Sequence, residues 1–230
     1  QIVKIKYNKN IYKFETKLIG KIQIKNILMA MIAATKSKLS FRKIINTIKN
    51  LKPASGRLEQ IGSIKNNSKV ILDYAHTPDA LETSLKSLKD QFKNSKISIV
   101  FGCGGDRDKA KRPMMGKIAN KYCDKVYLTD DNPRYENPIK IRNSIKKNIN
   151  RSKINEISNR ANAINKAIFD LKTGDILIVA GKGHEKIQEY KKIKKVFSDQ
   201  QQILKNIKIK NKTLSNSLKL NILKELSNSS

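Results

Sequence analysis

The chain has 230 residues, which is enough to enclose one sizeable hydrophobic core with a smaller attached unit. Its two cysteines, Cys103 and Cys123, are too few for a disulfide scaffold, and no spacing of cysteine and histidine indicates a zinc site. The sequence contains no run of about 18 apolar residues and no signal peptide. We therefore expect a cytoplasmic protein that does not insert into a membrane.

The chain is strongly basic, with 49 Lys and Arg against 19 Asp and Glu, a formal net charge of +30. Such a charge favours anionic partners, including nucleic acids. The basic residues are nevertheless spread along the whole chain, and aromatic residues make up only 6% of it, with no Trp. Few rings are then available to stack on bases. We expect no specific nucleic acid partner, although the charge would attract phosphorylated substrates.

Residues 1–52 differ in character from the rest of the chain. Two apolar runs, Ile2–Tyr7 and Ile11–Phe14, flank an Asn-Lys-Asn turn and predict a β-hairpin. Apolar residues at helical spacing predict one helix after Gly20 and a second over Phe41–Ile48. A hairpin and two helices enclose little core by themselves. We therefore expect this segment to be the α+β end of a truncated domain, and the absence of Met at the first position agrees.

From residue 53 to residue 210 the pattern is that of an α/β domain. Pro53–Gly56 predicts a linker, after which short apolar runs alternate with amphipathic helical segments. Strands are predicted at residues 70–72, 97–101, 126–128, 154–157 and 176–179. This alternation is typical of a mostly parallel sheet with helices on both faces, and right-handed crossovers make it Rossmann-like. Residues 211–230 are polar and poorly patterned, which predicts a tail or linker.

Four of the predicted strands run into polar loops that contain Gly or Pro. These loops are Asp73–Pro78, Gly102–Pro113, Asp131–Arg134 and Gly181–Glu185. The carboxyl ends of parallel strands share one edge of a sheet, where open α/β sheets bind ligands, so we expect the loops to converge. The Asp-Asn-Pro-Arg sequence combines a carboxylate, an amide and a guanidinium. Such a set suits a molecule that carries both ammonium and carboxylate groups.

Simpler interpretations of these loops also exist. An Asn-Pro turn can carry a solvated arginine, glycines can serve tight turns with positive φ, and His76 and His184 can be ordinary loop residues. Two phosphate-binding motifs are excluded. The segment Gly102–Gly104 begins like a dinucleotide fingerprint, but Arg107 stands where the third glycine belongs. A G-x-x-x-x-G-K-[ST] loop does not occur in the chain.

Five motifs together resemble those of the Mur ligases, in content and in order. They are Gly56–Glu59, Asp73–Leu81, Gly102–Pro113, Asp131–Arg134 and Gly181–Glu185. The resemblance is greatest to the members that add the third residue of the peptidoglycan stem peptide. In that family an N-terminal domain binds the UDP-sugar, a central P-loop domain binds ATP, and a Rossmann-like C-terminal domain delivers the amino acid. Residues 1–52 then correspond to the end of the central domain, and residues 53–210 to the C-terminal domain.

The resemblance implies an ATP-dependent ligase that joins meso-diaminopimelate to UDP-N-acetylmuramoyl-dipeptide. In such ligases ATP converts the peptide into an acyl phosphate, which the incoming amine attacks. ATP and Mg²⁺ are the implied cofactors, with Mg²⁺ bound mainly by the upstream part of the central domain. Because the family's Walker lysine and magnesium ligands lie upstream of Gln1, we expect no catalytic residue and no metal ligand here. We also expect no turnover by this chain alone.

The motifs also imply roles for individual residues. Arg57, Asp73 and His76 are expected to bind ATP, with Arg57 reaching the phosphates and Asp73 a ribose hydroxyl. The residues expected to hold meso-diaminopimelate are Arg107, Asp131, Asn132, Pro133, Arg134, Gly181 and Glu185. Arg134 would pair with the side-chain carboxylate of diaminopimelate, and Glu185 with its distal ammonium. Family members that add lysine usually lack this arginine, so its presence favours diaminopimelate.

Three alternatives stay open on the sequence alone. The first is a related ligase that adds lysine or another amine, which Arg134 disfavours. The second is a basic nucleic-acid-binding module that uses this fold, which the scattered charge disfavours. The third is a stand-alone regulatory or scaffold domain without turnover, which would require a natural start codon near Gln1.

Overall fold

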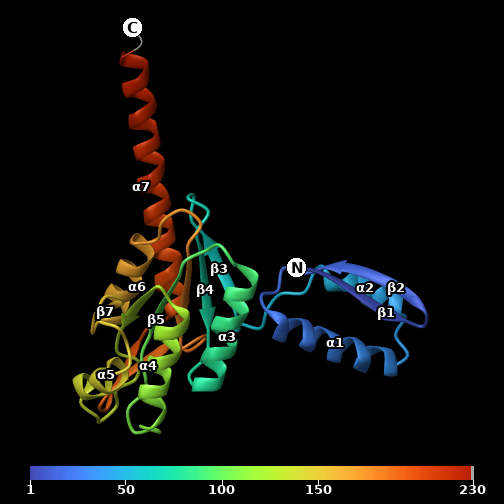
Figure 1. The fold of residues 1–230 in the computed structure, drawn as a ribbon, viewed down its shortest axis with the longest axis horizontal. Coiled ribbons are helices and arrows are strands. Elements are labelled where there is room, and N and C mark those ends of the chain that lie inside the picture. The colour runs from blue at the N-terminus through green and yellow to red at the C-terminus, as the bar shows by residue number, and fades with distance from the viewer. Residues whose placement is uncertain (229–230) are drawn as a thin grey trace.

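The computed structural model describes residues 1–228 and shows two units joined by the segment around residues 49–56 (Figure 1). In the N-terminal unit, β1 (Ile2–Tyr7) pairs antiparallel with β2 (Asn10–Glu15), and α1 (Lys21–Lys36) and α2 (Phe41–Ile48) follow. The predicted hairpin and both predicted helices are present. Their shared apolar core is small and contains Phe14, Leu18, Ile27, Met31 and Ile48.

The larger unit is built on a six-stranded sheet with the order β3-β4-β8-β5-β6-β7. Its strands are β3 (Glu59–Ser63), β4 (Lys69–Asp73), β5 (Ile97–Phe101), β6 (Lys125–Leu128), β7 (Ile154–Glu156) and β8 (Ile176–Ala180). Only the pair β3–β4 is antiparallel, and every other neighbouring pair is parallel. The parallel strands are those predicted from the sequence. β3 was not predicted, because its sequence Glu-Gln-Ile-Gly-Ser contains a single strongly apolar residue.

Helices cover both faces of this sheet. One face carries α3 (Pro78–Gln91), α4 (Lys111–Tyr122) and α5 (Pro138–Lys146), and the other carries α6 (Arg160–Phe169) and α7 (Asp199–Asn228). Successive side chains of a strand point to opposite faces, so Ile99 and Phe101 pack toward α3 and α4, whereas Val100 packs toward α6. The Rossmann-like fold is thereby confirmed. Across residues 1–228, no helix combines the length and apolarity needed to cross a bilayer.

The last helix differs from the sequence prediction. Residues 211–230 were expected to form a polar tail, but residues 211–228 continue α7 as a helix that projects past the sheet (Figure 1). The first turns of this stretch are held by contacts that a polarity profile does not show. Leu214 packs against the core beneath α7, and the backbone N–H of Lys65 donates to Asn211 Oδ1 at 2.8 Å. Residues 229–230 lie outside the described residues.

A second hairpin, also absent from the sequence prediction, follows the last strand of the sheet. In it β9 (Ile187–Tyr190) pairs antiparallel with β10 (Ile193–Val196). Its backbone also pairs with Arg134, whose N–H donates to the carbonyl of Glu189 at 3.2 Å and whose carbonyl accepts from Lys191 at 2.7 Å. The hairpin therefore lies directly against the loop that follows β6.

A buried ion pair connects the two helices of one face with the sheet. Arg160, the first residue of α6, donates from Nε and Nη2 to the two carboxylate oxygens of Asp199, at 2.7 Å each. Nη2 also donates to the carbonyl of Ala180, the last residue of β8, at 2.9 Å. Both charged side chains are fully buried. The pair thus fixes the starts of α6 and α7 at the sheet edge where the polar loops begin.

Asp199→Ala should destabilise the chain strongly, because it leaves the Arg160 guanidinium buried without its counter-charge. Breaking such a pair from one side typically costs ~3–5 kcal/mol. Urea denaturation of the full chain measures the loss. Lys166→Ala is the control: it removes the exposed ion pair with Asp170 in the same helix layer, and such pairs contribute ~0.5 kcal/mol or less. Equal effects of the two substitutions would contradict the assigned role of the buried pair.

Candidate functional site

The four polar loops meet at the carboxyl edge of the sheet and enclose a hollow of about 400 Å³, here called the loop hollow. Its lining includes six of the seven residues predicted to hold the amino acid: Arg107, Asp131, Asn132, Arg134, Gly181 and Glu185. The seventh, Pro133, is not part of the lining, and its carbonyl faces the glycine loop. The predicted convergence of the loops is therefore present in the structure.

The glycine loop after β5 lies directly against the Asp131–Arg134 turn. A Cβ atom on Gly105 would lie 1.9 Å from the carbonyl oxygen of Pro133, and one on Gly102 would lie 2.2 Å from the carbonyl oxygen of Thr129. The N–H of Gly105 also donates to the carbonyl of Asn132 at 2.9 Å. Positive φ angles occur at glycines of the loop after β8 and not at these two. Glycine is therefore needed at these two positions because two backbones approach closely, and not because the turn requires a left-handed conformation.

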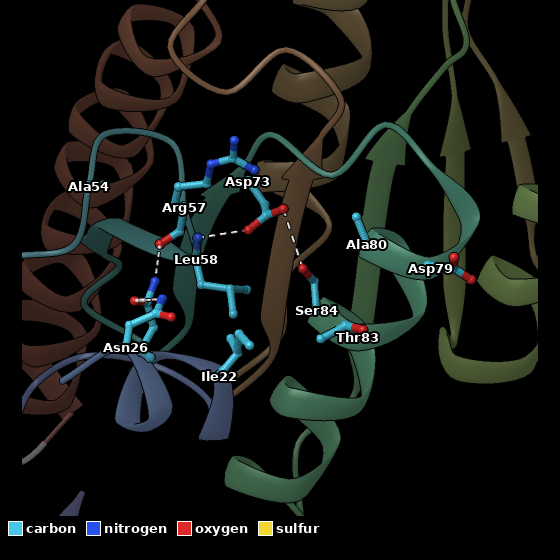
Figure 2. A pocket seen from close by; sticks show the side chains of 11 residues that line it. Ile22, Asn26, Ala54, Arg57, Leu58, Asp73, Asp79, Ala80, Thr83 and Ser84 are labelled. Carbon is cyan, nitrogen blue, oxygen red and sulfur yellow. Dashed lines mark hydrogen bonds between the residues drawn. The ribbon is translucent and has the colours of Figure 1, made fainter. Parts of the chain in front are cut away.

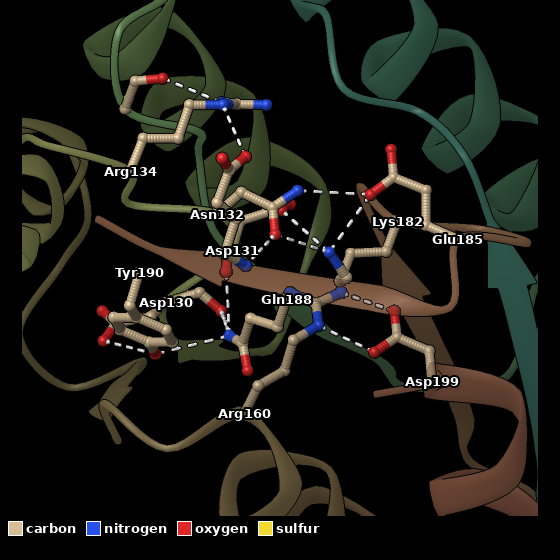
Figure 3. A network of polar contacts seen from close by, with 12 residues as sticks. Asp130, Asp131, Asn132, Arg134, Arg160, Lys182, Glu185, Gln188, Tyr190 and Asp199 are labelled. Carbon is tan, nitrogen blue, oxygen red and sulfur yellow. Dashed lines mark hydrogen bonds and ion pairs between the residues drawn. The ribbon is translucent and has the colours of Figure 1, made fainter. Parts of the chain in front are cut away.

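Arg134 reaches the hollow with its guanidinium already held on two sides (Figure 3). Nε pairs with Glu189 Oε2 at 3.2 Å, and Nη1 donates to the carbonyl of Gly105 at 2.9 Å. Its backbone has φ +50°, a left-handed value that is uncommon for residues other than glycine. The side chain is 22% exposed, and within the described part of the chain Nη2 makes no hydrogen bond. That nitrogen can donate to a bound carboxylate.

A buried lysine lies beneath the hollow (Figure 3). The Nζ atom of Lys182 donates to Asn132 Oδ1 at 2.9 Å and to Glu185 Oε2 at 3.1 Å, and it lies 3.5 Å from Asp131 Oδ1. Asn132 Nδ2 in turn donates to Glu185 Oε2 at 3.3 Å. Gly181 makes room for this arrangement, because a Cβ there would lie 2.9 Å from Asp131 Oδ2. Sequence reasoning missed Lys182, whose one signal was its place between two glycines of a polar loop.

Glu136 links the glycine loop to the segment that follows the Asp131–Arg134 turn. Sequence reasoning also missed this residue. Arg112 donates to both of its carboxylate oxygens, at 3.0 and 2.8 Å, and the N–H of Asp106 donates to it at 2.6 Å. The hydrogen bonds from Arg112, and after them the one from Asp106, lower the pKa of Glu136 to about 2. Arg107, one residue further along, is exposed at the rim of the hollow and donates to the carbonyl of Asp106 at 3.2 Å.

A second hollow, of about 440 Å³, lies between α1, the linker and the start of α3 (Figure 2). Arg57 and Asp73 line it. The Asp73 carboxylate is buried and accepts from the N–H groups of Leu58 and Ala75, at 2.7 Å each, and from the Ser84 hydroxyl at 3.3 Å. Burial raises the pKa of Asp73 against the opposing effect of these bonds. Asp73 thus fixes the segment that carries Arg57.

The residues predicted to bind ATP divide between the two hollows. His76 lines the loop hollow, away from Asp73, and its ring Nδ1 lies 2.9 Å from the carbonyl oxygen of Tyr74. The guanidinium carbon of Arg57 lies 4.9 Å from the centre of the Tyr74 ring, and Tyr74 lines the loop hollow. Arg57 therefore lies at the boundary of the two hollows, where one elongated ligand can contact both.

Comparison with known proteins agrees with this geometry. Residues 56–183, more than half of the chain, match the family model described as "Mur ligase, glutamate ligase domain". The chain belongs to the Mur ligase family. The matched segment begins at the glycine before Arg57 and ends two residues before Glu185. It contains the lining of the loop hollow except Glu185, and the part of the second hollow formed by Arg57, Asp73 and the start of α3.

Individual Mur ligases are similar over most of the chain. The UDP-N-acetylmuramoyl-L-alanyl-D-glutamate–2,6-diaminopimelate ligase of Rickettsia rickettsii is 43% identical over 210 residues, which cover 91% of this chain and 43% of the relative. A solved structure of a ligase with the same name is 35% identical with a TM-score of 0.70, over 90% of this chain and 42% of the other. The Thermotoga maritima MurF ligase shares the fold at 16% identity, with a TM-score of 0.63. The match covers 92% of this chain and 44% of the MurF chain. The chain thus spans less than half the length of these relatives.

Glu136→Gln should lower the free energy of unfolding at pH 7 by about 2 kcal/mol, as expected for loss of a hydrogen-bonded charge. The folded pKa is about 2 against an ordinary value of 4.5, so the carboxylate's contribution is fully present above pH 4.5 and is lost as the pH falls toward 2. Urea denaturation between pH 7 and pH 2 measures the free energy of unfolding of both proteins. The difference in this free energy between wild type and variant should become smaller below pH 4.5. Glu15→Gln, at an exposed position, is the control. A difference that does not depend on pH would count against this role for Glu136.

Proposed function

We propose that this chain is part of the ligase that adds meso-diaminopimelate to UDP-N-acetylmuramoyl-L-alanyl-D-glutamate in peptidoglycan synthesis. Residues 1–52 are assigned to the end of its ATP-binding domain and residues 53–210 to its amino-acid-binding domain. The observation that carries the proposal is the loop hollow, which combines a guanidinium, an amide and carboxylates at the ligand-binding edge of the sheet. Family membership and the names of the similar ligases support ATP-dependent amide bond formation.

The charges of the hollow match those of the proposed substrate. Meso-diaminopimelate carries two ammonium and two carboxylate groups, whereas lysine has no distal carboxylate. We assign the pairing with that carboxylate to Nη2 of Arg134, which lines the hollow, and Arg107 at the rim provides a second guanidinium. Glu185 uses Oε2 for Asn132 and Lys182, so Oε1 can accept from the distal ammonium. Arg134 therefore favours diaminopimelate over lysine.

The second hollow suits the nucleotide side of the reaction. The Asp73 carboxylate has about four acceptor positions and uses three of them within the chain, which leaves one for a ribose hydroxyl. Arg57 and His76 lie toward the loop hollow, where the phosphates of ATP have to approach the incoming amine. This chemistry depends on positioning and on neutralising charge, not on a protein nucleophile.

Mg²⁺, which the family resemblance implies, is proposed to be held mainly by residues outside this chain. Over the part of the chain that the structure describes, no three His, Cys, Asp or Glu side chains gather as metal ligands. The residues present do not fit a complete magnesium site, so no step is assigned to the metal here. Two carboxylates that line the loop hollow are instead paired: Asp131 with Lys182, and Glu185 with Lys182 and Asn132.

Arg134→Ala in the complete ligase should raise KM for meso-diaminopimelate about 10- to 100-fold and leave KM for ATP unchanged. The substitution removes a charged hydrogen-bonded pair of ~1.5–3 kcal/mol with the substrate carboxylate. Steady-state kinetics with each substrate varied in turn measures both constants. Arg151→Ala, at an exposed position away from the hollow, is the matched control. An equal rise of both KM values would argue against the assignment of Arg134 to the amino acid.

A further inference from the structure

We propose that Lys182 is a positioning residue, which fixes the amide of Asn132 and the carboxylate of Glu185 in the orientation that binds the amino acid. The inference rests on the proposed function of the loop hollow. Lys182 does not itself line the hollow but lies beneath it, so it acts through residues that do. Its role is therefore distinct from those of Arg134 and Glu185, which would touch the substrate.

Burial of the Lys182 ammonium is the first support. Its side chain is 0% exposed, and a buried ammonium is tolerated only where acceptors surround it. Those acceptors are Asn132 Oδ1, Glu185 Oε2 and, at the longer distance of 3.5 Å, Asp131 Oδ1. All three belong to residues that line the hollow. The positive charge also offsets the repulsion between the carboxylates of Asp131 and Glu185, which holds both close to one small ligand.

The orientation of the Asn132 amide is the second support. Its Oδ1 atom accepts from Lys182 Nζ at 2.9 Å and from the backbone N–H of Glu189 at 3.0 Å. Both partners can only donate, so the oxygen has to face them and Nδ2 has to face Glu185. A primary amide has two N–H groups, and the second remains to donate to a carboxylate of the ligand. Without Lys182, the Oδ1 atom loses one of its two donors and keeps the Glu189 N–H.

The place of Lys182 in the sheet is the third support. Lys182 follows β8 and Asn132 follows β6, and β5 lies between these two strands. The long side chain therefore bridges the end of β5, where the glycine loop packs against the Asp131–Arg134 turn. Figure 3 shows Lys182 reaching toward Asn132, with Asn132 and Glu185 around its ammonium. No other side chain in this network contacts both loops while remaining fully buried.

The test is an NMR titration of the full 230-residue chain with meso-diaminopimelate and, separately, with L-lysine. Lys182→Met keeps the length of the side chain and removes its charge. It should weaken binding of both ligands at least about 10-fold and leave their affinity ratio unchanged, because both carry a distal ammonium and an α-carboxylate. Arg134→Ala should instead weaken only diaminopimelate and abolish the preference. Lys186→Met, at an exposed position in the same loop, is the control and should bind like the wild type.

The outcomes separate the inference from the proposed function. A wild-type chain that does not bind diaminopimelate overturns the proposed function itself. A folded Lys182→Met chain that binds both ligands like the wild type, or that loses only one of them, overturns the role of Lys182. Amide spectra report whether each variant is folded. Where Lys182→Met does not fold, Lys182→Gln replaces it: this side chain keeps an N–H donor for Asn132 without the charge, and its expected loss is about 3- to 10-fold for both ligands.

Discussion

The Asp131–Arg134 turn is held by backbone contacts from two other segments, and the rest of the site depends on it. The glycine loop approaches so closely that a Cβ on Gly105 would meet the Pro133 carbonyl, and the β9–β10 hairpin pairs with both polar backbone groups of Arg134. Such contacts can maintain the left-handed backbone of Arg134, which costs free energy unless its surroundings impose it. The direction of the arginine side chain is therefore set by packing and not by the ligand.

Charged groups in the hollow share a common arrangement. Arg134 is held by Glu189 and the Gly105 carbonyl, and Glu185 is held by Lys182 and Asn132. Each keeps one polar atom directed away from these partners, so a zwitterionic ligand can bind without the side chains first becoming ordered. Preorganisation of this kind lowers the entropic cost of binding.

Sequence patterns predicted the parts of the fold that depend on burial. Ile97–Phe101 is buried at every position and apolar at all but Ser98, because both faces of its strand are covered. Parallel strands bring their carboxyl ends, with the polar loops, to one edge. The β9–β10 hairpin could not be predicted, since β10 is exposed and half of its residues are lysine. Lys182, Glu136 and Glu189 were missed for a related reason. Their importance lies in partners that are distant in sequence, and no local pattern records such contacts.

Binding of a diamino dicarboxylate in the loop hollow is tested most directly by mapping the backbone amide shifts of the isotopically labelled chain on addition of meso-diaminopimelate. We expect the perturbed amides to be those of Arg107, Asp131, Asn132, Arg134 and residues 181–185, with the amides of the N-terminal unit unchanged. Perturbations gathered around α1 and the second hollow, or none at saturating ligand, would contradict it.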